Sequence, residues 1–313
     1  MPPAPLYVVL NAGSGHDDTE TTARAIAEVF NAAGRPHEIF RVDDPKQLGE
    51  VAQQAVAKAM QSSGTVVAAG GDGTLNAVAQ ATLGSGCTFG VIPSGTFNYF
   101  GRTHGISSDT SVAARALLTA RVQNVQVGLV NDRVFLVNAS IGMYPQLLED
   151  REEQKHRHGR SRLVAAWAAL VTIFRGYRPM LVKLESDGQT HQLRTLTLFI
   201  TNNRLQLEQM GLEAGVVEEE RKLAAIVLGP VSKLSLLWLA LQGALGRLHE
   251  ANDVQRFSLT RLLVTPSNRL GRRLKVATDG EVTRMKTPIE FSVAPEHLQL
   301  LVPIDAVPET AKR

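Results

Sequence analysis

The sequence predicts two domains: an α/β N-terminal domain built on a parallel sheet, and a mainly antiparallel β-sandwich domain after it. Strands and helices alternate up to residue 128, which is typical of a parallel sheet covered by helices on both faces. Beyond that point most apolar runs are short and strand-like, and polar, glycine-containing loops follow three strands of the first half. We therefore expect domains over residues 1–128 and 129–303, and a tail over 304–313.

The composition limits the classes of protein to consider. Of the 313 residues, 44% are hydrophobic and 20% are charged, as in ordinary globular proteins. Lys and Arg outnumber Asp and Glu only by 33 to 30, so the net charge gives no reason to expect nucleic acid as a partner. The single cysteine, Cys87, forms no intrachain disulfide and is expected to be buried, which fits a cytosolic setting.

Targeting signals are not evident in the sequence. The first five residues lack the basic start and apolar core of a signal peptide. No apolar run reaches the ~18 residues that a membrane span needs. We therefore expect a cytoplasmic protein without a transmembrane segment.

In the first half, apolar runs predict strands, and apolar residues at helical spacing predict the helices between them. Asp44 and Pro45 are typical of a helix start, Asp109 of a helix cap, and Gly34 of a helix end. The predicted strands cover residues 6–10, 37–42, 65–69 and 88–92. Two of the predicted helices have apolar faces within 23–30 and 48–55, a third begins over 77–83, and a fourth runs from its cap at Asp109 to about residue 119.

A glycine-rich loop joins the strand at 65–69 to the helix at 77–83. Its glycines permit the close approach of a ligand, and the N–H groups of the loop and of the helix start favour a phosphate. Asp72 stands within the loop, and we expect its carboxylate to hold a metal, a hydroxyl or a lysine. The alternative is a tight turn in which Asp72 caps the helix. The loop consists of Gly70, Gly71, Asp72, Gly73, Thr74, Leu75 and Asn76.

Two further polar loops follow the strands at 6–10 and 88–92. Open α/β sheets bind ligands at the edge where the carboxyl ends of their strands lie, so we expect the three loops to meet there. The first of them reads Asn11, Ala12, Gly13, Ser14 and Gly15, and the other reads Pro93, Ser94, Gly95, Thr96, Phe97 and Asn98.

The second half is predicted to consist mostly of strands. Asp187 and Gly188 stand between two of them and indicate a tight hairpin. The longest helix is expected over residues 231–248. The predicted strands cover residues 134–139, 181–185, 193–200, 223–228, 257–264, 274–277, 289–293 and 298–302.

Two adjoining stretches of the second half leave alternatives open. Residues 151–162 are rich in Arg, Lys and His, and form either a solvated face or a contact with an anionic surface. Residues 163–174 are largely apolar but too short to span a bilayer. They form either a core helix, which we favour, or a helix at a membrane interface whose basic flanks extend the stretch to residue 178.

Taken together, the three loops resemble the signature loops of the diacylglycerol kinase catalytic-domain family, which includes bacterial lipid kinases and is related to sphingosine and ceramide kinases. The loops match in order and spacing. The resemblance continues at residues 140–144 and at Asp279, Gly280 and Glu281, so it extends over nearly the whole chain. It implies a fold like that of NAD kinase and diacylglycerol kinase, with ATP in the cleft between the nucleotide domain and a lipid-substrate domain.

The resemblance also implies roles for individual residues. Glu281 matches the family's general base, and a positioned carboxylate can take the proton of an alcohol as the phosphoryl group is transferred. Asp72 joins Glu281 as a catalytic residue, and Mg²⁺ neutralises phosphate charge. For residues 279–281 the alternative is a hairpin turn. The implied ATP contacts are Asn11, Gly13, Ser14, Gly15, Gly70, Gly71, Asp72, Gly73, Thr74, Asn76, Gly95, Thr96 and Asn98.

The chain departs from the family pattern at several positions. Ala12 replaces a proline in the first loop, and Arg41-Val42 stands where the family carries a threonine. An Asp-Gly pair that helps to hold Mg²⁺ in the family is absent; Glu220 is the best match to its aspartate, and Arg221 replaces its glycine. Residues 205–210 replace a glycine-rich stretch. These changes affect the metal site and the lipid pocket.

The function predicted from the sequence is an ATP-dependent lipid kinase that phosphorylates diacylglycerol or a similar lipid alcohol. Its partner is a lipid at a membrane surface, which implies a cytoplasmic protein that contacts the inner membrane face peripherally. A homodimer is one of the oligomeric states that the sequence allows. The alternatives are an NAD kinase, and a nucleotide-binding regulatory protein without turnover. The 93–98 loop and the absence of an Asn-Glu pair after it argue against NAD kinase.

Overall fold

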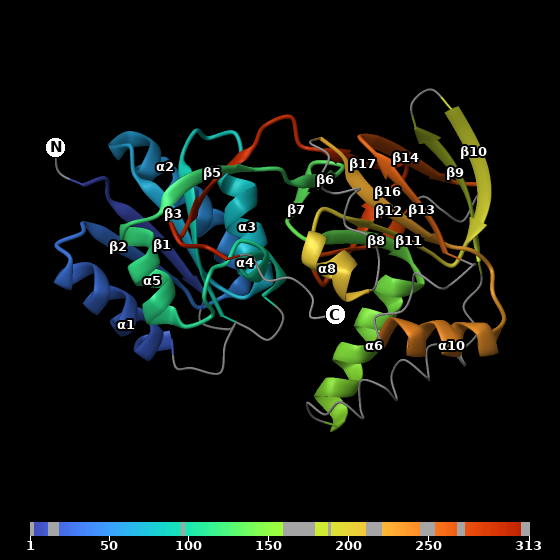
Figure 1. The fold of residues 1–313 in the computed structure, drawn as a ribbon, viewed down its shortest axis with the longest axis horizontal. Helices are drawn as coiled ribbons and strands as arrows, with labels where there is room; N and C mark the ends of the chain where they lie inside the picture. The colour runs from blue at the N-terminus through green and yellow to red at the C-terminus, as the bar shows by residue number, and fades with distance from the viewer. Residues whose placement is uncertain are drawn as a thin grey trace. The chain divides into compact units, whose positions relative to one another are not determined.

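The protein forms two compact units in a computed structural model that describes residues 3–11, 19–94, 98–158, 179–186, 189–210, 221–244, 254–267 and 273–307 (Figure 1). The first unit comprises Met1–Val127 together with Ala294–Arg313, and the second comprises Gly128–Val293. The first contains an α/β fold with a mostly parallel sheet, and the second contains two antiparallel sheets. The fold class expected from the sequence is therefore confirmed.

The sheet of the first unit has the order β2-β1-β3-β4-β18-β5. The neighbours from β2 to β18 are parallel, and β5 alone pairs antiparallel, with β18. Residues 6–9 and 66–69 of the central strands are almost wholly buried apart from Tyr7, as expected for strands covered on both faces. The strands are β1 (Leu6–Asn11), β2 (His37–Val42), β3 (Thr65–Gly70), β4 (Thr88–Pro93), β5 (Arg121–Val125) and β18 (Leu298–Val302).

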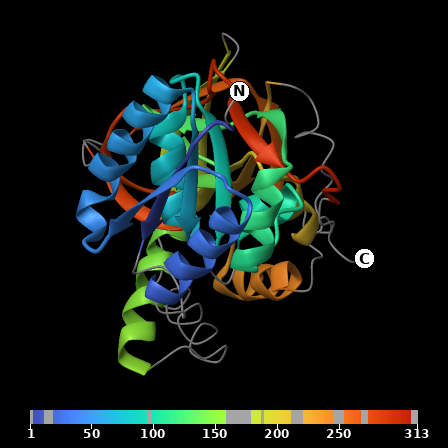
Figure 2. The same cartoon turned by 90° about the vertical axis from the view of Figure 1, so that its left-hand side faces the viewer.

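Helices cover this sheet in two groups. Helix α1 packs with α5 and helix α2 packs with α3, and the two groups lie on opposite sides of the strands (Figure 2). Asp109 caps α5 as expected, since its Oδ1 accepts a hydrogen bond from the N–H of Val112 at 2.8 Å. Asp44 caps the short 3₁₀ turn η2 (Pro45–Gln47), which precedes α2. The helices are α1 (Thr19–Ala32), α2 (Leu48–Ser62), α3 (Asp72–Thr82), α4 (Tyr99–Thr103) and α5 (Thr110–Leu118).

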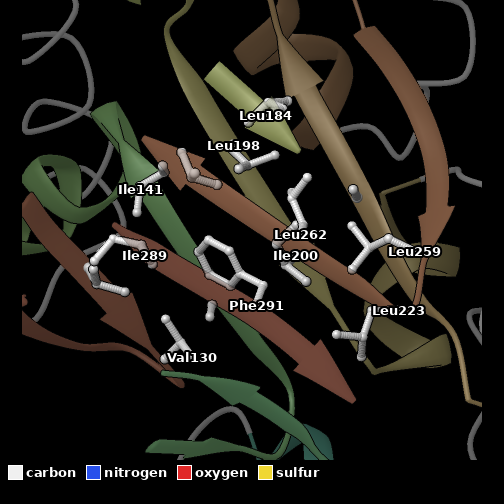
Figure 3. Packing of buried hydrophobic residues seen from close by; sticks show 14 of the residues in the cluster. Val130, Ile141, Leu184, Leu198, Ile200, Leu223, Leu259, Leu262, Ile289 and Phe291 are labelled. Atoms are coloured by element: carbon white, nitrogen blue, oxygen red, sulfur yellow. The ribbon is translucent and has the colours of Figure 1, made fainter. Parts of the chain in front are cut away.

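The second unit packs two six-stranded sheets, of order β10-β9-β14-β17-β6-β7 and β13-β12-β11-β8-β15-β16. Their inward side chains alternate with outward ones and form one buried cluster that includes Ile141, Leu198, Leu262 and Phe291 (Figure 3). The strands are β6 (Gly128–Val130), β7 (Arg133–Phe135), β8 (Asn138–Gly142), β9 (Met180–Ser186), β10 (Gln189–Thr195), β11 (Thr197–Thr201), β12 (Leu223–Leu228), β13 (Val254–Leu259), β14 (Arg261–Pro266), β15 (Arg273–Thr278), β16 (Glu281–Lys286) and β17 (Ile289–Val293).

Three helices of this unit lie within the described residues. They are α6 (Met143–His158), α8 (Arg204–Gln209) and α10 (Lys233–Ala244). Residues 151–158 of the basic stretch belong to α6, whereas residues 159–178, with the apolar run at 163–174, lie outside the described residues. None of the described helices is long and apolar enough to cross a membrane.

The structure differs from the expected elements at several places. Residues 298–302, expected in the second domain, form β18 between β4 and β5 in the sheet of the first unit. The single strands expected at 193–200 and 257–264 are each two strands, because the chain turns at Leu196 and Thr260. Residues 140–144, where the family resemblance continues, form the end of β8 and the start of α6 with no loop between them. The antiparallel pair β9–β10 brackets Asp187 and Gly188, which themselves lie outside the described residues.

Gly142 permits the sharp junction between β8 and α6. Its φ is +101°, and a Cβ built there would lie 2.4 Å from the carbonyl oxygen of Leu196. That oxygen accepts a hydrogen bond of 2.8 Å from the N–H of Met143, the first residue of α6. The close approach of two backbone segments therefore leaves no room for a side chain.

We predict that Gly142→Ala lowers the free energy of unfolding by about 2–4 kcal/mol, because both the backbone conformation and the contact with Leu196 resist a Cβ. Gly49→Ala in α2 is the matched control, since a Cβ at Gly49 meets no atom within 4 Å. That control should be neutral or stabilising by up to ~1 kcal/mol. Urea unfolding of the two variants measures both effects, and equal stability for both would show that the junction is not close-packed.

Candidate functional site

The glycine-rich loop is the junction between β3 and α3. Strand β3 ends at Gly70, Gly71 is the N-cap residue of α3, and Asp72 is the first helical residue. Asp72 is therefore not the helix cap, which was the alternative interpretation of this loop. Gly71 provides no side-chain cap, and the first helical hydrogen bond joins the N–H of Leu75 to the carbonyl of Gly71. The start of α3 thus presents backbone N–H groups of the kind that bind anions.

A hydrogen bond brings the first and middle loops together. The Asn11 amide at the end of β1 donates from Nδ2 to Oγ1 of Thr74, in the first turn of α3, at 3.0 Å. Thr74 is buried, and a Cβ at Gly70 would lie 2.7 Å from its Oγ1. Gly70 therefore makes room for Thr74, and Thr74 positions Asn11.

The third loop begins at the same edge of the sheet. The N–H of Ser94, directly after β4, donates to the carbonyl of Gly70 at 2.8 Å. Strands β3 and β4 pair in register up to Gly70 and Pro93. The described ends of the three predicted loops therefore meet at the carboxyl edge of the parallel strands, where open α/β sheets bind their ligands.

Asn98, the last residue of the third loop, has a buried side-chain amide. It is 4% exposed, has a φ of +41°, and neither Oδ1 nor Nδ2 has a hydrogen-bond partner within the described part of the chain. A buried amide without partners is destabilising, so such a group is a candidate for contact with a ligand. Gly101 allows this placement, because a Cβ there would lie 2.4 Å from Oδ1 of Asn98.

Tyr99 and Arg102 of α4 add to the electrostatics of this region. The Arg102 guanidinium lies over the Tyr99 ring, 5.7 Å from the ring centre. Burial raises the pKa of the Tyr99 hydroxyl, the positive charge of Arg102 opposes this shift, and the negative charge of Asp72 adds to it. The hydroxyl therefore stays protonated near Asp72. Neither residue was predicted from the sequence, although both stand directly after the third loop.

Several predicted site residues lie outside the described residues. These are Gly13, Ser14, Gly15, Gly95 and Thr96 of the loops and Glu220, the predicted metal ligand. Across the residues that the structure does describe, no group of three or more His, Cys, Asp or Glu side chains could hold a metal ion.

In the second unit, Asp279 and Gly280 form a two-residue turn between β15 and β16. Their φ values are +47° and +93°, and Thr278 pairs with Glu281 across the turn. Positive φ at both positions is the conformation for which Asp-Gly is preferred in tight hairpins. The hairpin expected as the alternative for these residues is therefore present, and Glu281 is the exposed first residue of β16.

The Asp279 carboxylate organises the neighbouring backbone. It accepts three hydrogen bonds from consecutive N–H groups: Leu136 at 2.7 Å, Val137 at 2.8 Å and Asn138 at 2.9 Å. The N–H of Asp279 in turn donates to the carbonyl of Asn138 at 2.9 Å. Asp279 thus fixes the entry into β8 beside the turn that carries Glu281.

A buried polar cluster adjoins this turn and was not anticipated from the sequence. Gln206 of α8 accepts through Oε1 from Asn138 Nδ2 and from Thr201 Oγ1, each at 3.2 Å. Asn203 caps α8 by accepting from the N–H of Gln206 at 2.9 Å. Asn138 Oδ1 and Ser140 Oγ are buried without a partner among the described residues. Residues 205–210, which replace a glycine-rich stretch of the family, therefore supply a helix that reaches into this cluster.

Two family models match successive parts of the chain. Residues 5–130 match the diacylglycerol kinase catalytic domain, and residues 149–302 match the YegS C-terminal NAD kinase beta sandwich-like domain. Together the two models extend over nearly the whole chain, in the order found in the fold. The chain belongs to the diacylglycerol kinase catalytic-domain family, with a C-terminal domain of the YegS type.

Curated relatives of the chain are named as lipid kinases or diacylglycerol kinases. The chain is 30% identical over 140 residues to a Cronobacter sakazakii protein named "Probable lipid kinase YegS-like", and 27% identical over 198 residues to a diacylglycerol kinase of Bacillus subtilis. These alignments cover 44% and 62% of this chain, and 45% and 63% of the relatives, so the chain spans about half to two thirds of their length. A longer alignment, to a diacylglycerol kinase of Staphylococcus aureus, is 25% identical and covers 84% of this chain and 82% of that protein.

Solved structures support the fold. The crystal structure of a diacylglycerol kinase from Bacillus anthracis superposes with a TM-score of 0.68 and 18% identity, over 97% of this chain and 98% of that chain. At this identity the likeness supports the fold alone.

We predict that Asp279→Asn lowers the free energy of unfolding by about 2–3 kcal/mol, because an amide accepts fewer of the three backbone hydrogen bonds and loses their charge assistance. Asp305→Asn, at an exposed position after β18, is the control and should change stability by less than about 0.5 kcal/mol. Chemical denaturation of both variants provides the measurement. If Asp279→Asn is as stable as the control, the carboxylate does not hold the entry into β8.

His104, which follows α4, has an unusual titration. Its ring packs edge-on against buried Phe100 with 4.8 Å between ring centres, and burial lowers the pKa of His104 to about 4. Between pH 6.5 and 4 the unfolded chain therefore binds a proton that the native chain does not, and stability falls as the pH falls through this window. His104 as a whole residue is half-buried, so we expect only part of the full effect on stability.

We predict that the wild type loses about 1–2 kcal/mol more stability than His104→Phe between pH 7 and pH 4, since the variant removes the titrating ring and keeps the aromatic contact. Urea unfolding at several pH values measures this difference. Parallel pH profiles for the two proteins would contradict the buried neutral state of His104.

Proposed function

We propose that this protein is an ATP-dependent lipid kinase, which transfers the γ-phosphate of ATP to the hydroxyl of diacylglycerol or a similar lipid alcohol. Membership of the family and the names of the relatives support the reaction class. The identity of the acceptor lipid is proposed only as a class of lipid alcohol, because the residues of the lipid pocket depart from the family pattern. The proposed setting is the cytoplasm, with peripheral contact at the inner membrane face. Both a monomer and a homodimer are compatible with this function.

The observation that carries the proposal is the meeting of the three loop ends in the first unit. The Asn11–Thr74 bond and the Ser94–Gly70 bond hold two loops against the start of α3. Helix α3 begins without a side-chain cap, and the buried amide of Asn98 has no hydrogen-bond partner among the described residues. The backbone N–H groups at this helix start and the Asn98 amide together suit the phosphates and polar groups of a nucleotide.

In this proposal the nucleotide-binding residues are those of the three loops: Asn11, Gly13, Ser14, Gly15, Gly70, Gly71, Asp72, Gly73, Thr74, Asn76, Gly95, Thr96 and Asn98. Glu281 acts as the base that takes the proton of the lipid hydroxyl. Its place beside a turn fixed by Asp279 supports this role, because a base must be held in a defined position. Asp72 and Glu281 belong to different units.

Asp72 and Glu220 are the residues that would hold Mg²⁺. The metal would neutralise charge on the phosphates. Glu220 lies outside the described residues, and within them no group of three or more His, Cys, Asp or Glu side chains could hold a metal.

We expect purified protein, incubated with radiolabelled ATP, Mg²⁺ and a total lipid extract, to yield a labelled phospholipid. Glu281→Gln should lower the rate by about 10²–10⁴-fold at nearly unchanged ATP affinity, because it removes only the proton acceptor. Asp72→Asn should weaken nucleotide or metal binding as well as the rate. Calorimetric titration with ATP separates the two effects.

Glu296→Gln is the control for these variants, since Glu296 is exposed and lies before β18, away from the predicted loops. It should retain full activity. ATP binding without any labelled lipid would favour the regulatory alternative. Full turnover by Glu281→Gln would show that Glu281 is not the base.

A further inference from the structure

Residues 136–138, at the entry into β8, are held from two sides. On one side, three consecutive N–H groups of this segment donate to the Asp279 carboxylate. On the other side, the carbonyl of Val137 accepts from Oγ1 of Thr201 at 2.8 Å and from the N–H of Asn202 at 3.0 Å. The segment therefore links the end of β11 to the turn between β15 and β16.

Gln206 of α8 adds a side-chain contact to the second side. Its Oε1 accepts from Nδ2 of Asn138 at 3.2 Å, and the residue is only 8% exposed. The hydroxyl of Thr201 lies at the same distance from this oxygen, so its one hydrogen is shared between Gln206 and the carbonyl of Val137. The N–H of Gln206 donates to Oδ1 of Asn203, the cap of α8, at 2.9 Å. Gln206 thus joins α8 to Asn138.

Burial makes the contact between Gln206 and Asn138 specific. Asn138 is 6% exposed, and a buried donor without an acceptor is destabilising, so Gln206 favours one orientation of the Asn138 amide. The backbone of Asn138 exchanges two hydrogen bonds of 2.9 Å with Asp279. Glu281 follows Asp279 by two positions, as the first residue of β16. A displacement of Asn138 therefore moves the turn that carries Glu281.

We propose that Gln206 is a positioning residue for Glu281. It acts through Asn138, whose backbone is bonded to the turn at Asp279. This proposal rests on the proposed function, in which Glu281 takes the proton of the lipid hydroxyl. Glu281 is exposed, so we expect the turn, rather than burial of its own side chain, to define where its carboxylate lies. A displacement of about 1 Å in a reacting group can lower a rate by about 10²-fold.

Hydrogen exchange tests the contact without an activity assay. Gln206→Leu introduces a side chain of similar size and removes the acceptor. The amide hydrogens of two segments, 136–138 and 279–281, should exchange about 10-fold or more faster in the variant, because both segments are held through Asn138. Unchanged exchange in both segments would overturn the proposal.

Thr195→Val is the matched control. Thr195 is fully buried, and its Oγ1 lies 2.7 Å and 2.8 Å from the carbonyl oxygens of Thr197 and Leu228. The variant therefore also removes a buried polar contact of the second unit, but at the opposite end of β11 from Thr201. Exchange in the two segments and kcat should both stay as in the wild type.

The kinase assay tests the role in catalysis. Gln206→Leu should lower kcat by about 10-fold or more at a nearly unchanged KM for ATP, since the proposed nucleotide residues belong to the first unit. In a protein that already carries Glu281→Gln, the same substitution should cause little further loss, because the group that Gln206 positions is then absent. A merely structural role predicts the same fold-loss in both backgrounds, and that result would overturn the proposal.

Failure of this proposal is distinguishable from failure of the proposed function. If the wild type phosphorylates a lipid and Gln206→Leu keeps full kcat, the proposed function stands and the positioning role is wrong. If the wild type phosphorylates no lipid, both fail, and hydrogen exchange then reports only whether Gln206 holds the turn. If Gln206→Leu does not fold by circular dichroism, Asn203→Ala takes its place. It removes the side-chain cap of α8 and should give the same pattern in both assays.

Discussion

The sheet of the first unit depends on a strand from the far end of the chain. Strand β18 lies between β4 and β5. Residues 298–302 therefore provide the only strand partner that β5 has in the described sheet. Leu298, Leu300 and Val302 of this strand are buried. One backbone edge of β4 and the backbone groups of β5 therefore have no strand partner until residues 298–302 add β18, which follows the second unit in the sequence. The completion of the first sheet thus depends on nearly the whole chain.

The parallel arrangement gives the first unit its candidate site. Parallel strands all present their carboxyl ends at one edge, so loops that are far apart in sequence begin side by side. Small contacts then fix them: Thr74 fills the space that Gly70 leaves and receives the Asn11 amide. The start of α3 has no side-chain cap, and the Asn98 amide has no partner within the described ranges, so both are groups that a ligand could satisfy. The contacts that fix the loops and the groups that the candidate site offers thus lie on neighbouring residues.

The second unit combines a rigid turn with an uncovered surface. Asp279 uses its carboxylate for three backbone hydrogen bonds, which leaves Glu281 as the exposed carboxylate of the pair. The family resemblance alone does not distinguish a turn from a catalytic position here; the geometry shows that the segment is a turn and that the two carboxylates differ in their surroundings. Helix α10 adds the exposed Leu234 and Trp238, a feature that packing within the unit does not explain.

The sequence by itself determined the local features of this protein. Apolar runs located most strands, Asp109 located a helix cap, and the spacing of three glycine-containing loops indicated the family, because each signal depends on neighbouring residues. The pairing of β18 with the first sheet, the contact of Asp279 with residues 136–138, and the exposed face of α10 were decided only by the tertiary structure. Each of these joins residues distant in sequence or depends on which side of an apolar helix the core covers, and no local pattern records either.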